Sequence, residues 1–206
     1  EKPGEGFFEA ELYSLPPELK ALKAEIDRLQ AEEEQAGLAR DYEHAAQKTA
    51  ERLRMRAEAR AALTSGGADF VVHYQPIVSL RDGSVLAVEA LVRWRHPKDG
   101  LVVPQQFVGV AESTGQIHKL TRFVFSKAMA QLAVWRDAGL QSKMAVNVSI
   151  DALSSLDFAD FANEQASTHG VSPKDVTIEV TESRLLQDLR APLEVLTRLH
   201  LMRFQL

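Results

Sequence analysis

The chain has 206 residues, of which 45% are hydrophobic and 26% are charged, and its formal net charge is −5 at pH 7. This composition is typical of one or two globular domains, and the negative balance gives no basic surface for DNA. Because there is no cysteine, disulfides, thiolate nucleophiles and cysteine-based zinc sites are excluded. No apolar run is long enough to span a bilayer. The start has neither a signal-peptide core nor an initiator methionine, so we expect a piece of a longer protein.

Residues 1–63 have the composition of a helical segment, rich in Ala, Glu, Lys, Arg, Gln and Leu. Leu22, Leu29 and Ala36 recur at seven-residue spacing, as on the contact face of a coiled coil. Gly37 predicts a break, after which a second helix would begin within a few residues. Two helices joined in this way form an antiparallel hairpin. The sequence therefore predicts an N-terminal α-helical hairpin or a coiled coil.

Two strings in this region are similar to a known helical module. ARDYEHAA at 39–46 resembles the UVR-type helical hairpin. Together with LPPELK at 15–20 it resembles the middle domain of Clp-class AAA+ chaperones, although Lys48-Thr49 stands where that family usually carries an Arg-Asp pair. A chaperone-like hairpin and a signalling coiled coil both imply a protein partner and no catalysis. Residues 64–68, which contain two glycines, are predicted to form a linker.

Residues 69–206 are predicted to alternate strands and helices. The first two strands, at 69–78 and 85–95, flank Asp82-Gly83, which strongly favours a hairpin and hence antiparallel pairing. The later elements are expected as a helix at 117–138, a strand at 143–149, a helix at 158–169, a strand at 176–180 and a helix at 192–200. This alternation is typical of an α/β fold with a parallel sheet or barrel. Since a complete β/α barrel takes about 250 residues, we expect roughly half of one.

Short motifs follow one another in this region. They are YQPIV at 74–78, EALVRW at 89–94, VNVS at 146–149 and EVTE at 179–182. Three of them present an oxygen-bearing side chain, Glu89, Asn147 or Glu179, at the predicted end of a strand. Hard divalent cations prefer carboxylate and amide oxygens, and β/α barrels carry their chemistry at the ends of their strands. Taken singly, each residue also fits a plainer interpretation, such as a solvent-facing glutamate or an asparagine that caps a turn.

The order and wording of these motifs resemble the EAL family of bacterial cyclic-di-GMP phosphodiesterases. The resemblance covers about residues 70–206. It implies the first half of a modified TIM (β/α) barrel with its first strand antiparallel, forming an EAL domain over 69–206 that stops before its second half. It also implies that Glu89, Asn147 and Glu179 are catalytic ligands of two divalent cations, Mg²⁺ or Mn²⁺, in a cytoplasmic bacterial signalling protein.

By the same resemblance, further residues bind the substrate or support the site. Gln75 would contact the bound dinucleotide, Leu91 would line the floor below it, and Arg93 would pair with a substrate phosphate. Glu182 would hold a neighbouring active-site loop without binding metal. The six histidines show no pair at metal-ligand spacing, and we interpret them as structural or solvated.

The implied reaction is metal-assisted hydrolysis of cyclic di-GMP to linear pGpG. The family continues, where this chain ends at Leu206, with an Asp-Asp-Phe-Gly-Thr-Gly segment, a lysine, a glutamate and a glutamine. We therefore expect the 206 residues alone to be inactive. Two alternatives remain: a non-catalytic module that binds cyclic di-GMP or a protein, and an interaction protein that acts through its N-terminal helices. A homodimer is also left open.

Overall fold

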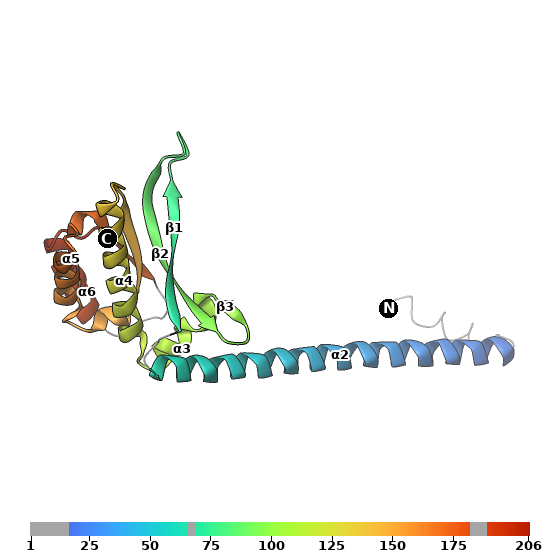
Figure 1. Ribbon diagram of the computed structural model, residues 1–206. Helices are drawn as coiled ribbons and strands as arrows, with labels where there is room; N and C mark the ends of the chain where they lie inside the picture. The colour runs from blue at the N-terminus through green and yellow to red at the C-terminus, as the bar shows by residue number, and fades with distance from the viewer. Residues whose placement is uncertain (1–16, 66–68, 182–188) are drawn as a thin grey trace, which may run out of the picture. The chain divides into compact units, whose positions relative to one another are not determined.

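The computed structural model describes residues 17–65, 69–181 and 189–206 (Figure 1). By its internal contacts the chain forms two compact units, Glu1–Leu53 and Arg54–Leu206. Part of the expected linker, residues 66–68, lies outside the described residues. Within the described ranges, no helix combines the length and the apolar composition that crossing a membrane requires.

Helix α2 runs without interruption from Pro17 to Thr64, so the expectation of a helical hairpin is wrong. Gly37 lies inside this helix and is not among the residues with positive φ, so no left-handed turn ends the helix there. A glycine inside a helix costs only about 1 kcal/mol relative to alanine, and the helix-favouring residues around Gly37 offset that cost. The coiled-coil alternative requires a long helix of this kind, and its pairing with a partner stays a prediction.

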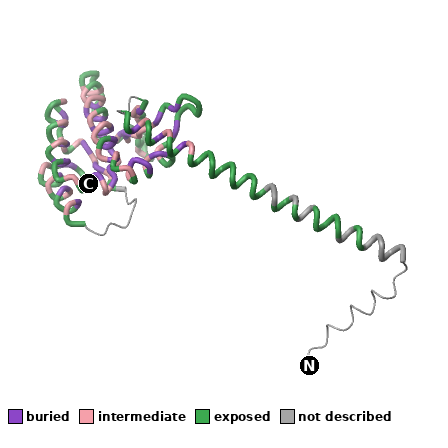
Figure 2. Tube along the Cα trace, turned by 90° about the horizontal axis from the view of Figure 1, so that it is seen from below, coloured by how far each residue is buried: buried purple, intermediate pink, exposed green. Residues whose placement is uncertain are grey.

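The last turns of α2 belong to the second unit. Met55, Ala59 and Leu63 recur every four residues and therefore lie along one side of the helix. All three are buried within the hydrophobic core of this unit. Figure 2 shows the buried residues gathered in the second unit, with exposed residues along the earlier part of α2. The C-terminal end of α2 is thus an integral part of the second unit.

The second unit is built on a five-stranded mixed sheet with the order β1-β2-β4-β5, in which β3 also pairs with β2. β1 and β2 are antiparallel, β3 is antiparallel to β2, and β4 and β5 continue the sheet in parallel. The strands are β1 (Phe70–Val78), β2 (Val85–His96), β3 (Gly100–Val102), β4 (Lys143–Ser149) and β5 (Val176–Thr181). The sheet is not closed into a barrel, and its antiparallel first strand confirms the predicted fold class.

The predicted turn between β1 and β2 is formed as its sequence requires. Gly83 adopts φ of 73°, a left-handed conformation that glycine reaches without steric cost. The carboxylate of Asp82 accepts hydrogen bonds from the backbone N–H and the hydroxyl of Ser84, at 3.0 and 2.7 Å. These bonds hold the pKa of Asp82 below its usual value. The local sequence therefore fixes the hairpin and, with it, the register of β1 on β2.

Helices α4, α5 and α6 lie together on one side of the sheet (Figure 1). The helices of this unit, besides the end of α2, are α3 (Val108–Ser113), α4 (Ile117–Asp137), α5 (Phe158–Thr168) and α6 (Arg190–Leu201). Phe125 of α4 is fully buried and packs against the rings of Phe158, Phe161 and Phe204 at 6.0–6.2 Å. Aromatic packing of this kind fixes the helices against one another and against the end of the described chain.

Candidate functional site

The three predicted metal ligands lie on neighbouring strands. Asn147 and Glu179 lie close to the ends of β4 and β5, but Glu89 lies inside β2, which continues to His96, so the expectation that it ends a strand is wrong. Asn147 pairs in register with Glu179, and Glu89 pairs with Ala145, two residues before Asn147. Because side chains alternate along strands and register partners share a face, all three point to the same side of the sheet. Asn147 on β4 therefore stands between the two glutamates of β2 and β5. The structure brings together the residues that the motifs singled out.

The side chains of this group interact directly. Asn147 Nδ2 donates a hydrogen bond to Glu89 Oε1 at 2.6 Å, which leaves the amide oxygen of Asn147 available as a ligand. Burial, and secondly the charge of Glu89, raise the pKa of Glu179 above its usual value. Within the described ranges neither glutamate forms an ion pair with a Lys, Arg or His. Two carboxylates and an amide oxygen without a compensating charge form a donor set that suits a hard divalent cation.

The predicted substrate-binding residues share the face of Glu89. Gln75 is the antiparallel register partner of Glu89, and Leu91 and Arg93 follow Glu89 at two-residue intervals on β2. Arg93 is half-buried, and its Nη1 donates to the carbonyl oxygen of Val92 at 2.8 Å. The geometry therefore places these side chains along one face, while their roles stay predictions. Glu182 lies outside the described residues.

Strand β1, which carries Gln75, is anchored to α4 through the preceding residue. The hydroxyl of Tyr74 donates to the carbonyl oxygen of Lys127 at 3.1 Å, and its ring packs edge-on against Trp135 at 5.1 Å. Burial raises the pKa of Tyr74 to about 12, so the hydroxyl stays neutral and keeps donating at physiological pH. Tyr74 thus fixes the strand while Gln75, on the opposite side, stays exposed.

A cleft of about 580 Å³ opens beside Glu89 and Asn147. Its walls come from β2 and β4, from the 3-10 turn η1 (Pro104–Gln106), and from α3 and α4. This volume falls in the range of small-molecule sites. Leu91 also lines the cleft, as do two residues that the sequence did not single out as functional, Glu112 and Ser149. Ser149 falls within the VNVS motif at 146–149, whereas Glu112 lies outside the four motifs.

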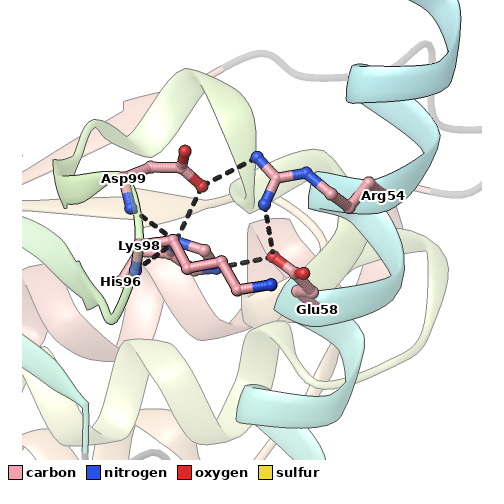
Figure 3. A network of polar contacts seen from close by, with 5 residues as sticks. All are labelled: Arg54, Glu58, His96, Lys98 and Asp99. Atoms are coloured by element: carbon pink, nitrogen blue, oxygen red, sulfur yellow. Dashed lines mark hydrogen bonds and ion pairs between the residues drawn. The ribbon is translucent and has the colours of Figure 1, made fainter.

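A second polar group lies away from the cleft, where α2 meets the β2–β3 connection (Figure 3). His96, whose side chain is 2% exposed, places Nε2 at 2.6 Å from Glu58 Oε2 and Nδ1 at 2.7 Å from Asp99 Oδ2. The ligand atoms of these three residues lie within 4.8 Å of one another, so the group could bind a metal ion. However, Arg54 already bridges the two carboxylates, at 2.9 Å to Asp99 and 3.4 Å to Glu58.

The geometry of this second group favours an ion-pair network over a metal centre. The two carboxylates contact opposite nitrogens of His96, whereas a histidine ligand offers one nitrogen to a metal. The guanidinium of Arg54 also supplies positive charge to both carboxylates. The network joins the C-terminal turns of α2 to strand β2, and it agrees with the interpretation of His96 as a structural residue.

The raised pKa of Glu179 predicts how the stability of the metal-free protein depends on pH. The folded state keeps this proton to a higher pH than the unfolded chain does, so the free energy of unfolding falls as the pH rises from the ordinary pKa of a glutamate through the raised value. Glu89→Gln removes the second cause of the shift and keeps the acceptor oxygen for Asn147. We expect its Tm in EDTA to exceed that of the wild type by about 1–2 °C at neutral pH and to converge with it near about pH 4. Parallel Tm curves for the two proteins would contradict this expectation.

Comparison with known proteins identifies the family. The model of the EAL domain matches residues 56–206. The chain therefore belongs to the EAL domain family, which confirms the resemblance drawn from the motifs. The match begins at residue 56, beyond the strings at 15–20 and 39–46, and does not bear on their resemblance to the chaperone middle domain.

Relatives with curated names support this assignment. The chain is 37% identical over 133 residues to the bifunctional diguanylate cyclase/cyclic di-GMP phosphodiesterase MucR of Pseudomonas aeruginosa, covering 64% of this chain and 19% of MucR. It is 36% identical over 148 residues to the cyclic di-GMP phosphodiesterase NbdA of the same organism, covering 71% of this chain and 19% of NbdA. The chain thus spans about a fifth of the length of the curated relatives it matches.

Solved structures share the fold. The structure of the P. aeruginosa MucR phosphodiesterase in complex with c-di-GMP matches with a TM-score of 0.64 and 34% identity, covering 73% of this chain and 61% of that one. The EAL domain of FimX from Xanthomonas citri, in complex with c-di-GMP, matches with a TM-score of 0.61, covering 76% of this chain and 60% of that one. At 24% identity, the second likeness shows the fold alone.

Proposed function

We propose that the EAL domain of this chain hydrolyses cyclic di-GMP to linear pGpG with two divalent cations, Mg²⁺ or Mn²⁺, in bacterial second-messenger signalling in the cytoplasm. The observation that carries the proposal is the juxtaposition of Glu89, Asn147 and Glu179 beside a cleft of small-molecule size, with no counter-charge among the residues that the structure describes. The named relatives that act on cyclic di-GMP supply the substrate.

The residues present fit a divalent cation. Glu89, Asn147 and Glu179 would hold it, because two carboxylates supply the charge and the amide supplies a neutral oxygen. When bound, the ions supply an activated water and stabilise the charge that develops on the phosphate oxygens. The hydrogen bond from Asn147 to Glu89 orients both side chains before any ion binds. The raised pKa of Glu179 means that cation binding competes with its proton.

Substrate binding falls to the other residues on this face. Arg93 can offer two parallel N–H donors to a phosphate once its bond to the neighbouring carbonyl is released. Gln75, beside Glu89 across the hairpin, would hydrogen-bond the dinucleotide, and Leu91 would form an apolar floor in the cleft. Glu182 would hold a neighbouring active-site loop. These side chains position the scissile phosphate against the cation site.

A second proposed role concerns helix α2. Leu38, Tyr42 and Leu53 are 52%, 75% and 58% exposed, which is costly for apolar side chains in water. We propose that this part of α2 contacts another protein or a second copy of the chain. The role is tested by comparing the sedimentation of the wild type with that of the double variant Tyr42→Glu/Leu53→Glu. The wild type is expected to sediment as the larger species. Equal masses for the two proteins, with no partner bound to either, would contradict the role.

The proposed reaction is tested by following pGpG release from cyclic di-GMP by chromatography. Protein that carries the family's segments after Leu206 is expected to form pGpG with Mn²⁺ or Mg²⁺ and none in EDTA. Residues 1–206 alone are expected to release no product. If the longer protein bound cyclic di-GMP tightly without cleaving it, the chain would be a non-catalytic binding module and not an enzyme. Cleavage in EDTA would contradict the role of the cations.

A further inference from the structure

A partly buried hydrogen bond joins the two cleft residues that the sequence did not single out. The hydroxyl of Ser149 donates to Glu112 Oε1 at 2.8 Å, and the two residues are 37 positions apart in the chain. Ser149 is only 5% exposed and is one of the few buried polar residues of the described chain. A buried hydroxyl is retained only where it is hydrogen-bonded, because its desolvation otherwise destabilises the fold. The bond therefore fixes how β4 meets α3.

This bond acts close to the candidate cation site. Ser149 is the last residue of β4 and pairs with Thr181 of β5, while Asn147 lies two residues earlier on the same face. Glu112, Ser149, Asn147 and Glu89 all line the cleft. The side chain of Asn147 also donates a hydrogen bond to Glu89 of β2. Besides its backbone pairing with β5, the end of β4 is thus held by one side-chain hydrogen bond to β2 and by another to α3.

We propose that Glu112 is a positioning residue which, through Ser149, holds the end of β4 so that the amide of Asn147 faces the cation site. This inference rests on the proposed function, since it assumes that Asn147 binds a cation. Glu112 has no ion-pair partner within the described residues. Glu112 therefore acts through an acceptor oxygen and not through its charge. A glutamine at this position keeps such an oxygen and should preserve the function. Outer partners of metal ligands typically change metal affinity by about 10- to 100-fold.

The test is the Mn²⁺ affinity of the 206-residue chain, measured by the paramagnetic resonance signal of free Mn²⁺. Ser149→Ala and Glu112→Ala are each expected to weaken binding by about 10- to 100-fold. Because both remove the same bond, the double variant should bind no more weakly than the weaker single variant. Glu112→Gln is expected to bind as the wild type does. The matched control is Ser113→Ala, which removes a hydroxyl that bonds within α3 to Val110.

The outcomes separate this inference from the proposed function. Wild-type affinity in Ser149→Ala and Glu112→Ala, with affinity lost in Glu89→Gln, would overturn the positioning role and leave the cation site standing. Binding by Glu112→Gln as weak as that by Glu112→Ala would show that Glu112 acts through its charge, which also overturns the role. Unchanged binding by Glu89→Gln would overturn the cation site itself and this inference with it. Thermal melts of every variant are measured first, and binding is then measured at a temperature at which all of them are folded. A loss of Mn²⁺ affinity then reflects a change at the site and not unfolding.

Discussion

Replacing Glu89 with glutamine is expected to lower the hydrolysis of cyclic di-GMP by about 10²- to 10³-fold or more, as for other groups that stabilise charge in a reaction. Glutamine matches glutamate in size and can still accept the hydrogen bond from Asn147. It lacks the negative charge that a divalent cation requires. The measurement, on protein that carries the family's segments after Leu206, is kcat for pGpG release at saturating Mn²⁺, together with the Mn²⁺ concentration that gives half-maximal rate.

The control for this prediction is Glu164→Gln. Glu164 is an exposed residue of α5 and does not line the cleft, so its neutralisation changes the net charge equally without touching the site. We expect wild-type kcat for this control. If Glu89→Gln also retained wild-type kcat and the same Mn²⁺ requirement, Glu89 would not be a cation ligand.

Replacing His96 with alanine is expected to cause the largest loss of stability, about 2–3 kcal/mol, or about 5–10 °C in Tm. The imidazole is 2% exposed and contacts a carboxylate on each side, and its ring packs edge-on against Trp94 at 4.6 Å. Leaving buried hydrogen-bonding groups without a partner costs about 1–3 kcal/mol, and the lost packing of the ring against Trp94 adds to this loss. The side chains of Glu58 and Asp99 are 32% exposed, so water can satisfy part of what they lose.

The same variant should loosen the end of α2. In the wild type the amides of residues 54–64 are held by the helix, by the core contacts of Met55, Ala59 and Leu63, and by the His96 network. We expect His96→Ala to speed hydrogen exchange at these amides more than at those of β4. The control is Lys98→Ala, because Lys98 is exposed and contributes only its backbone N–H to the network. Equal Tm values for His96→Ala and the wild type would show that the network does not stabilise the fold.

Much of the fold of the second unit could be predicted from its sequence, because neighbouring residues determine where its strands, turns and helices form. Asp82-Gly83 fixed the first hairpin, and the alternation of apolar runs with helical segments predicted the order of β4, α5, β5 and α6. The convergence of Glu89, Asn147 and Glu179 followed from motifs placed on successive strands, although Glu89 lies inside β2 and not at its end. In each case the information lies within a few neighbouring residues or in a repeated pattern.

The features that could not be predicted depend on contacts between distant segments. Glu58 and His96 are 38 positions apart, and Glu112 and Ser149 are 37 positions apart, so no spacing rule connects them. The break expected at Gly37 failed for a different reason. A single glycine shifts the helix equilibrium by only about 1 kcal/mol, and the surrounding helix formers outweigh it.

The most direct test of the cation site is anomalous diffraction from crystals grown with Mn²⁺. We predict an ion within about 2.5 Å of a carboxylate oxygen of Glu89 or Glu179 and of the amide oxygen of Asn147. An ion found only among Glu58, His96 and Asp99, or no ion near Glu89, Asn147 and Glu179 at saturating Mn²⁺, would contradict the proposed cation site and the hydrolysis built on it.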